Sequence, residues 1–251
     1  MAINVNSVYK TVLSILNKEQ RGNITPDEFN KIANLVQLDI FERYFDDLTQ
    51  QVRVPQTDRE YSNRVLDVDE KIARFKVSGS CKSLGGGVFK LPVSVNGSAD
   101  PNAVHKLGVV TYENPDIGGN VEIERLTSKE FFQNQRSNLT RSSKNFPTYI
   151  YEGETSSGNR KTITVSPDTI DSGVFAYFVR KPNTVMWAST GGTLGQLLYD
   201  QGNSKDFELH PSETVNIITR ILLYSGVVIS DPQVVQLASS KIQADEINQK
   251  S

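Results

Sequence analysis

The sequence contains almost no cysteine, little histidine and no long apolar run. Cys81 is the only cysteine among 251 residues, which excludes an intrachain disulfide and a cysteine-based zinc cage and suits a reducing compartment. The two histidines, His105 and His210, are too few for most zinc sites and stand outside any HExxH-like motif. The longest apolar stretch, around 221–229, is interrupted and falls far short of the ~20 residues of a membrane span. We therefore expect no metal, no cofactor and no membrane insertion.

Neither sign of charge dominates the chain. There are 27 basic and 29 acidic residues, for a formal net charge of -2. This balance gives no broad electrostatic reason to bind nucleic acid or an anionic membrane, so such binding would have to be local. Lys10 is the first basic residue, which argues against a secretory signal.

The N-terminal region is predicted to be helical. Apolar residues at three- and four-residue spacing predict an amphipathic helix at about 5–20. Thr25, Pro26 and Glu28 have the pattern of a capping box, which predicts a second helix from Pro26 to about Gln50.

A third helix is indicated by a heptad-like seam that continues to the end of this region. Such a seam predicts a helical partner, either the second helix of the same chain or a neighbouring subunit. The apolar residues of the seam are Tyr61, Val65, Val68, Ile72 and Phe75.

The middle of the chain has the pattern of a β domain. From Lys76 to about Trp187, short β-branched or aromatic runs are separated by Gly, Pro, Asn and Asp, which predicts an antiparallel β-sandwich or barrel. The main runs lie at 88–91, 107–112, 121–123, 149–151, 162–165 and 174–179. A second capping box, at Thr127 and Glu130, predicts a turn or two of helix within this domain.

The C-terminal region returns to a helical pattern. His210 and Pro211 lead into an apolar helix with Gly226 as its predicted stop, and Asp231-Pro232 restarts a second helix, so that the chain ends in a helical hairpin. The predicted fold class is therefore α+β. Its expected parts are amphipathic helices at 1–76, a β domain at 77–190, and a Gly-rich connection with C-terminal helices at 191–251.

No stretch assembles a recognisable catalytic constellation. The glycine runs at 85–87 and 191–195 lack the Walker Lys-Ser/Thr and the GxGxxG spacing, and are predicted to be turns or flexible loops. Carboxylate pairs could serve a glycosidase if their separation were right, but such charges usually form a solvated face. The candidate pairs are Asp46 with Asp47, Asp67 with Asp69, and Glu122 with Glu124.

One segment has a local excess of positive charge. Between Arg125 and Asn145 five basic residues stand against Glu130 alone, a local balance of +4. Such a segment is either a solvated loop or a contact for DNA or an acidic partner. The five candidate contact residues are Arg125, Lys129, Arg136, Arg141 and Lys144.

Several stretches together resemble a known group of virion proteins. They are Ile163-Thr164-Val165-Ser166-Pro167, Phe175 to Pro182, Trp187, Lys205 to Leu209, and the N-terminal Ile24 to Asn30. Their order resembles structural ring proteins of the head-to-tail region of crAss-like and related short-tailed bacteriophages.

The resemblance implies a non-enzymatic adaptor subunit of the phage neck. Such a subunit would form a homo-oligomeric ring of twelve in the virion, dock on the portal and other neck or tail proteins, and surround the channel through which DNA passes during ejection. Heterologous contacts between copies close into a ring when the rotation permits. The C-terminal helices are the expected partner-binding region, through Phe207, Leu209, Ile218, Ile221, Leu222, Val235 and Ile242.

Two alternatives come from other functional classes. A receptor- or glycan-binding tail module would need an exposed aromatic platform, for which Trp187, Tyr149 and Tyr151 are the candidates. A cell-wall hydrolase would use paired carboxylates. Both alternatives rank behind the ring subunit.

Overall fold

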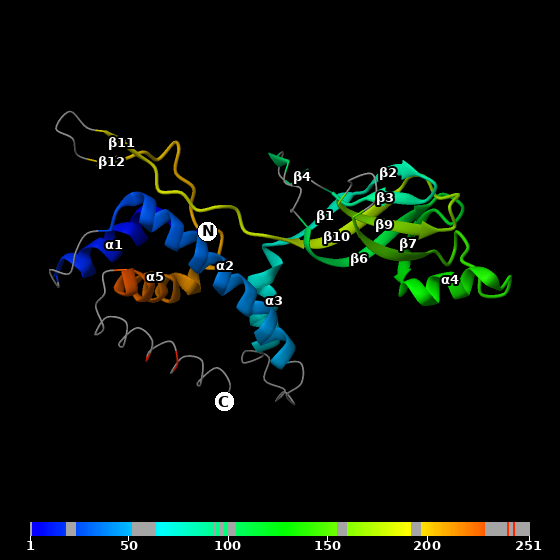
Figure 1. Ribbon diagram of the computed structural model, residues 1–251, viewed down its shortest axis with the longest axis horizontal. Coiled ribbons are helices and arrows are strands. Elements are labelled where there is room, and N and C mark those ends of the chain that lie inside the picture. Colours follow the sequence, from blue (N-terminus) through cyan, green and yellow to red (C-terminus); the bar gives the residue numbers. More distant parts are fainter. Residues whose placement is uncertain are drawn as a thin grey trace. The chain divides into compact units, whose positions relative to one another are not determined.

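The computed structural model describes residues 2–18, 24–51, 64–92, 94–95, 98–99, 104–154, 160–191 and 197–228, together with Ser240 and Gln243 (Figure 1). The chain forms two compact units. The terminal unit comprises Met1–Lys71 and Pro182–Ser251, and the inserted unit comprises Ile72–Lys181. The chain therefore leaves the terminal unit once and returns to complete it.

The terminal unit is built mainly from helices: α1 (Val5–Lys18), α2 (Pro26–Gln51), α3 (Arg64–Ala73, which ends in the inserted unit), the short 3-10 helix η2 (Pro211–Glu213) and α5 (Thr214–Val228). The capping box at the start of α2 is formed, because Glu28 accepts bonds from the backbone N–H and hydroxyl of Thr25. Helix α5 packs against both α1 and α2. The fully buried side chains of this unit include Val12, Phe29, Phe41, Phe207, Leu209, Ile217 and Ile221.

Two partly buried ion pairs join distant parts of this unit. The Arg220 guanidinium lies 2.7 Å from the Asp39 carboxylate, which connects α5 to α2. The Lys71 ammonium lies 2.7 Å from the Glu213 carboxylate, which connects α3 to η2. Because Glu213 and Arg220 are buried, each needs its partner to offset the loss of water.

An extended segment at 183–187 runs along α2 and is bonded to the amide side chains of that helix. The side chain of Asn30 bonds both the N–H and the carbonyl of Trp187, and that of Asn34 does the same for Val185. Gln37 donates to the Asn183 carbonyl. Residues three or four apart on a helix share one face, and their spacing along the axis is close to that of alternate residues in an extended chain. We call this arrangement the amide ladder.

The same segment carries the base of a short hairpin, β11 (Ser189–Gly191) with β12 (Leu197–Tyr199). The Trp187 ring lies between two tyrosines, with its centroid 4.3 Å from that of Tyr9 and 5.9 Å from that of Tyr199. The Trp187 indole N–H donates to the Asn6 side chain. These contacts anchor the base of the hairpin to α1.

The inserted unit is a curled, half-barrel sheet of eight strands. The strands lie in the order β1 (Lys76–Ser80), β10 (Val174–Arg180), β6 (Val104–Asn114), β7 (Gly119–Arg125), β8 (Thr148–Glu154), β9 (Arg160–Ser166), β3 (Val88–Lys90) and β2 (Lys82–Gly85). Neighbours are antiparallel except β7 and β8, which are parallel. A separate pair is formed by β4 (Ser94–Val95) and β5 (Ser98–Ala99).

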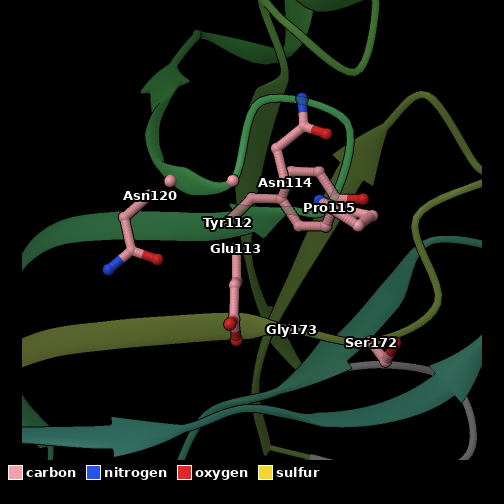
Figure 2. A pocket seen from close by; sticks show the side chains of 9 residues that line it. Tyr112, Glu113, Asn114, Pro115, Asn120, Ser172 and Gly173 are labelled. Atoms are coloured by element: carbon pink, nitrogen blue, oxygen red, sulfur yellow. The ribbon is translucent and has the colours of Figure 1, made fainter.

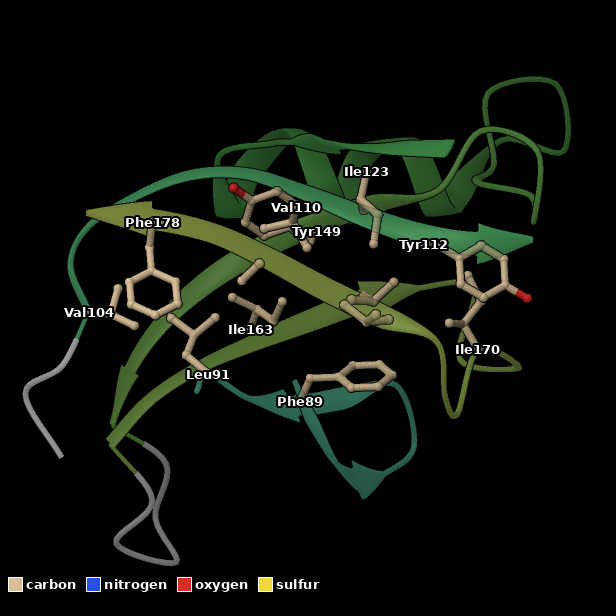
Figure 3. Packing of buried hydrophobic residues seen from close by; sticks show 13 residues of the cluster. Phe89, Leu91, Val104, Val110, Tyr112, Ile123, Tyr149, Ile163, Ile170 and Phe178 are labelled. Atoms are coloured by element: carbon tan, nitrogen blue, oxygen red, sulfur yellow. The ribbon is translucent and has the colours of Figure 1, made fainter. Parts of the chain in front are cut away.

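Alternating residues of these strands fill the concave side of the sheet. Figure 3 shows Phe89, Leu91, Ile163 and Phe178 directed into one apolar cluster, which also takes in Ile123 and Tyr149. The turn from β2 to β3 uses three consecutive glycines with positive φ, Gly85, Gly86 and Gly87. The predicted turn at 85–87 is therefore confirmed.

Helix α4 (Ser128–Arg136) is the one α-helix that lies wholly within the described part of the inserted unit. It fills the connection between the parallel strands β7 and β8 and contacts β8. The capping box predicted at its start is confirmed, with the Thr127 side chain and the Glu130 backbone and side chain bonded reciprocally.

The predicted α+β class is confirmed, and all six strand runs form strands. Helix α5 continues to Val228, so the stop predicted at Gly226 is wrong. A glycine inside a helix costs about 1 kcal/mol relative to alanine, and the two valines that follow still extend the helix. The second arm of the predicted C-terminal hairpin lies outside the described residues.

The two units also differ from the three consecutive parts expected from the sequence. The terminal segments belong to one unit, and the return into it begins at Pro182, ahead of the glycine-rich passage.

Candidate functional site

The surface of α4 brings cations and an exposed aromatic ring onto one helix face. Lys129, Phe132 and Arg136 follow one another at spacings of three and four residues, so they share a face, and all three are exposed. The Phe132 side chain is 59% exposed. An apolar ring between two cations suits a partner that is both acidic and apolar.

The opposite side of α4 fixes the helix to the sheet. Phe131 is buried, and its ring meets that of Phe132 edge to face at 5.8 Å. Hydrogen bonds from the Thr127 hydroxyl and backbone N–H lower the pKa of the Glu130 carboxyl. The charged Glu130 therefore supports the first turn of the helix, where acid is favoured by the helix dipole.

The loop after α4 carries two more of the predicted cations. Arg141 and Lys144 are exposed, as are Leu139 (96%) and Phe146 (79%). The buried side chain of Asn114 donates to the Lys144 carbonyl and to the Asn145 side chain, which ties this loop to the end of β6.

Arg125 completes the set from the end of β7. It is exposed, and its guanidinium carbon lies 5.7 Å from the centre of the Tyr151 ring on β8. All five predicted basic residues have exposed side chains: Arg125 ends β7, Lys129 and Arg136 lie on α4, and Arg141 and Lys144 lie in the following loop. We call these residues, with Phe132, the basic surface.

The predicted partner-binding residues have different positions. Phe207, Leu209 and Ile221 are fully buried, so their side chains belong to the core of the terminal unit and are not available to a partner in this conformation. Ile218 and Leu222 are half-buried. Val235 and Ile242 lie outside the described residues. Apolar helical spacing marks buried positions, and it does not distinguish the core of one chain from an interface.

The aromatics proposed for a glycan platform do not form one. Trp187 and Tyr149 are 5% and 2% exposed, and only Tyr151, at 37%, reaches solvent appreciably. Trp187 also belongs to the terminal unit, whereas the two tyrosines belong to the inserted unit. Tyr149 belongs to the core cluster of the inserted unit, and Trp187 to the base of the hairpin.

The remaining candidates for chemistry are placed as follows. His210 accepts the Ser212 N–H at the start of η2, as the prediction of a helix-entry residue requires. Within the described ranges, no three His, Cys, Asp or Glu side chains gather in a way that could hold a metal ion.

A hollow of about 620 Å³ lies at the turn between β6 and β7 (Figure 2). Among its nine lining residues Glu113 carries the one charged side chain, so the hollow offers no carboxylate pair.

No protein-family model matches this chain, and no curated protein matches it either. In the described part of the chain, every helix is too short or too polar to cross a bilayer. The basic surface is therefore the candidate site on structural grounds alone.

Proposed function

We propose that this chain is a structural subunit of a bacteriophage head-to-tail junction, an adaptor whose copies form a ring of twelve that docks on the portal and surrounds the DNA channel. The resemblance of the segments around β9, β10, Trp187 and 205–209 to neck proteins supplies the phage context. In this proposal the protein is made in the host cytoplasm, resides in the virion and performs no catalysis.

The observation that carries this proposal is the presence of exposed apolar side chains on elements that are firmly anchored. The hairpin β11–β12 exposes Leu197 (56%) and Leu198 (50%), while Trp187 and Tyr199 hold its base. Helix α4 exposes Phe132, while Phe131 and the capping box hold the helix. Grouped apolar side chains on a preformed surface are typical of protein–protein contact sites.

A virion subunit also has a use for the basic surface. DNA in the channel and acidic segments of neighbouring proteins are both negatively charged, and either would be attracted to it. The remainder of the chain offsets this charge, for an overall balance of -2, which suits a channel wall that must let DNA slide.

The first experiment is a mass measurement by light scattering on the purified protein, alone and with a portal protein from a short-tailed phage that carries this chain. A discrete ring, or a monomer that becomes a ring on the portal, is the expected result. A monomer that stays monomeric in both conditions would contradict the proposal.

A truncation after Val228 separates docking from folding. It retains α1 to α5 and the whole inserted unit, so the circular dichroism spectrum should keep its cooperative thermal transition. We expect this variant to lose portal association, because the expected partner-binding region continues beyond α5. Unchanged association would place the portal contact on the described residues.

A further inference from the structure

We propose that the basic surface of one copy docks on the exposed acidic face of α3 of a second copy, and that this is the head-to-tail contact of the ring. This inference rests on the proposed ring function. It adds a specific pair of surfaces and a polarity.

The first argument is the division of charge between the two units. The inserted unit has 14 basic and 10 acidic residues, a formal charge of +4, and the terminal unit has 13 basic and 19 acidic residues, a formal charge of -6. The near-neutral chain therefore consists of a basic part and an acidic part. Two copies attract each other best when the inserted unit of one faces the terminal unit of the next.

The second argument is the composition of the exposed face of α3. Leu66 is 56% exposed, and Asp67 and Glu70, one and four residues further on, are exposed as well. The other side of α3 is engaged in its own chain, since Val68 is buried and Lys71 pairs with Glu213. The exposed face is thus an apolar side chain accompanied by two carboxylates on an anchored helix.

The exposed faces of α3 and α4 are complementary in charge and in apolar surface. On α4 the exposed Phe132 has cations three residues before it and four residues after it, and on α3 the exposed Leu66 has two anions within the next turn. Burying Phe132 against Leu66 would remove apolar surface from water, while the surrounding charges meet opposite charges.

The arrangement also determines the polarity of assembly. The two faces lie on different parts of the chain, so two copies could also pair reciprocally as a closed two-fold dimer. In a ring each copy instead uses its α4 face on one neighbour and its α3 face on the other, and a single contact leaves one free face on each partner. A contact of this kind continues from copy to copy until it closes, as a ring requires.

DNA is the competing occupant of the basic surface. A single exposed ring on one helix face makes a poor stacking platform for successive bases, whereas it suits insertion beside another apolar side chain. The acidic face of α3 would also remain unexplained if α4 bound DNA alone. The observations therefore favour a second copy.

The test uses the full chain with one face removed at a time. One variant carries Lys129→Ala, Phe132→Ala and Arg136→Ala, and the other carries Leu66→Ala, Asp67→Ala and Glu70→Ala. Each variant alone should stay monomeric at concentrations where the wild type forms a ring, with the contact weakened about tenfold or more. Mixed together, they should form dimers and nothing larger, because only one intact pair of faces remains.

A charge swap tests the pairing directly. Lys129→Glu with Arg136→Glu should abolish the ring, and adding Asp67→Lys with Glu70→Lys to the same chain should restore it. A matched control, Lys82→Glu with Lys181→Glu, makes the same change in charge at exposed positions of the inserted unit away from α4, and should leave the ring intact.

The outcomes separate the two proposals. A wild type that forms no ring, alone or on the portal, contradicts the proposed function and this contact with it. A wild-type ring that persists in both alanine variants overturns the contact alone. Normal rings that have lost affinity for DNA would assign the basic surface to DNA instead.

Discussion

Asn34 satisfies both backbone polar groups of Val185. Its side-chain amide donates to the Val185 carbonyl at 2.9 Å, and its side-chain oxygen accepts the Val185 N–H at 2.8 Å. The two residues are 151 positions apart, and Val185 itself is buried. One helical side chain thus does for this extended segment what a neighbouring strand does in a sheet.

Replacing Asn34 with alanine should destabilise the terminal unit. The substitution leaves the N–H and the carbonyl of Val185 without these partners, and an unsatisfied group of this kind costs about 1–3 kcal/mol. We expect the midpoint of urea unfolding to fall accordingly. Leu35→Ala, at an exposed neighbouring position on α2, is the control and should change the free energy of unfolding by no more than about 0.5 kcal/mol. If the two substitutions had equal effects, the amide ladder would not be a source of the stability of this unit.

Lys71→Met should destabilise the same unit, because it leaves the Glu213 carboxylate without its ion-pair partner. Glu213 keeps its bond from Asn216 but loses its cation, and the side chain of Glu213 is only 9% exposed. We expect a loss of about 1–3 kcal/mol in chemical unfolding. Adding Glu213→Gln to the Lys71→Met variant should recover part of the lost free energy of unfolding.

The control for this ion pair is Lys31→Met, which breaks the 2.7 Å pair with Asp27 at the surface of α2. Both of these side chains are about three-quarters exposed, at 75% and 76%, so the loss should stay within about 0.5 kcal/mol. A loss as large as that of Lys71→Met would show that burial does not govern these pairs.

Gly87→Ala should destabilise the inserted unit. A Cβ at Gly87 would lie 2.5 Å from the Val165 carbonyl oxygen, and the φ of +76° is unfavourable for alanine. We expect a cost of about 2–4 kcal/mol in thermal or urea unfolding. Gly86→Ala has a similar φ but open space around the added Cβ, so it should cost only about 1 kcal/mol. If both variants were equally stable, the close approach of Gly87 to the Val165 carbonyl would not be what makes alanine unfavourable at position 87.

The thiol of Cys81 should react slowly in the folded protein. Burial against the core of the inserted unit raises the pKa of this thiol to about 12, whereas an unfolded cysteine titrates near 8.5. At pH 8 the thiolate fraction, and with it the rate of alkylation by iodoacetamide, should be about a thousandfold below that of the urea-unfolded chain.

The same shift of the Cys81 pKa has a consequence for stability. The folded form holds its proton to a higher pH, so this contribution to stability is complete below about pH 8.5 and is lost as the pH rises toward 12. Cys81→Ala should remove that part of the pH dependence. Fast alkylation of the folded protein at pH 8 would contradict the assignment.

The local elements of this fold could be predicted from the sequence because their signals are local. The capping boxes at Thr25 and Thr127 fix helix starts through residues three apart, and the β-branched runs fix strands through alternation. The return of the chain to the terminal unit could not be predicted in this way. It depends on Asn30, Asn34 and Gln37, which along a helix have the pattern of an ordinary polar face.

The candidate site was predictable in part for the same reason. The excess of positive charge between Arg125 and Lys144 is a property of consecutive residues, and the structure adds that each cation is exposed. The burial of Phe207 and Leu209 was not predictable from local spacing; Phe207 forms a β-bridge with Ile3, at the other end of the chain. The exposure of Phe132 beside the buried Phe131 follows only from the orientation of α4 on the sheet.

Because the terminal unit is made of two segments, there is a delay during translation between the synthesis of its first part and its second part. The 110 residues of the inserted unit are translated between the two halves of the terminal unit, which at 5–20 residues per second takes about 5–20 s. Throughout that interval the apolar sides of α1 and α2 have been made, but α5 has not. The inserted unit is a single uninterrupted segment, so it can fold once β10 has left the ribosome, whereas the terminal unit cannot be completed until the segment after Pro182 has been made.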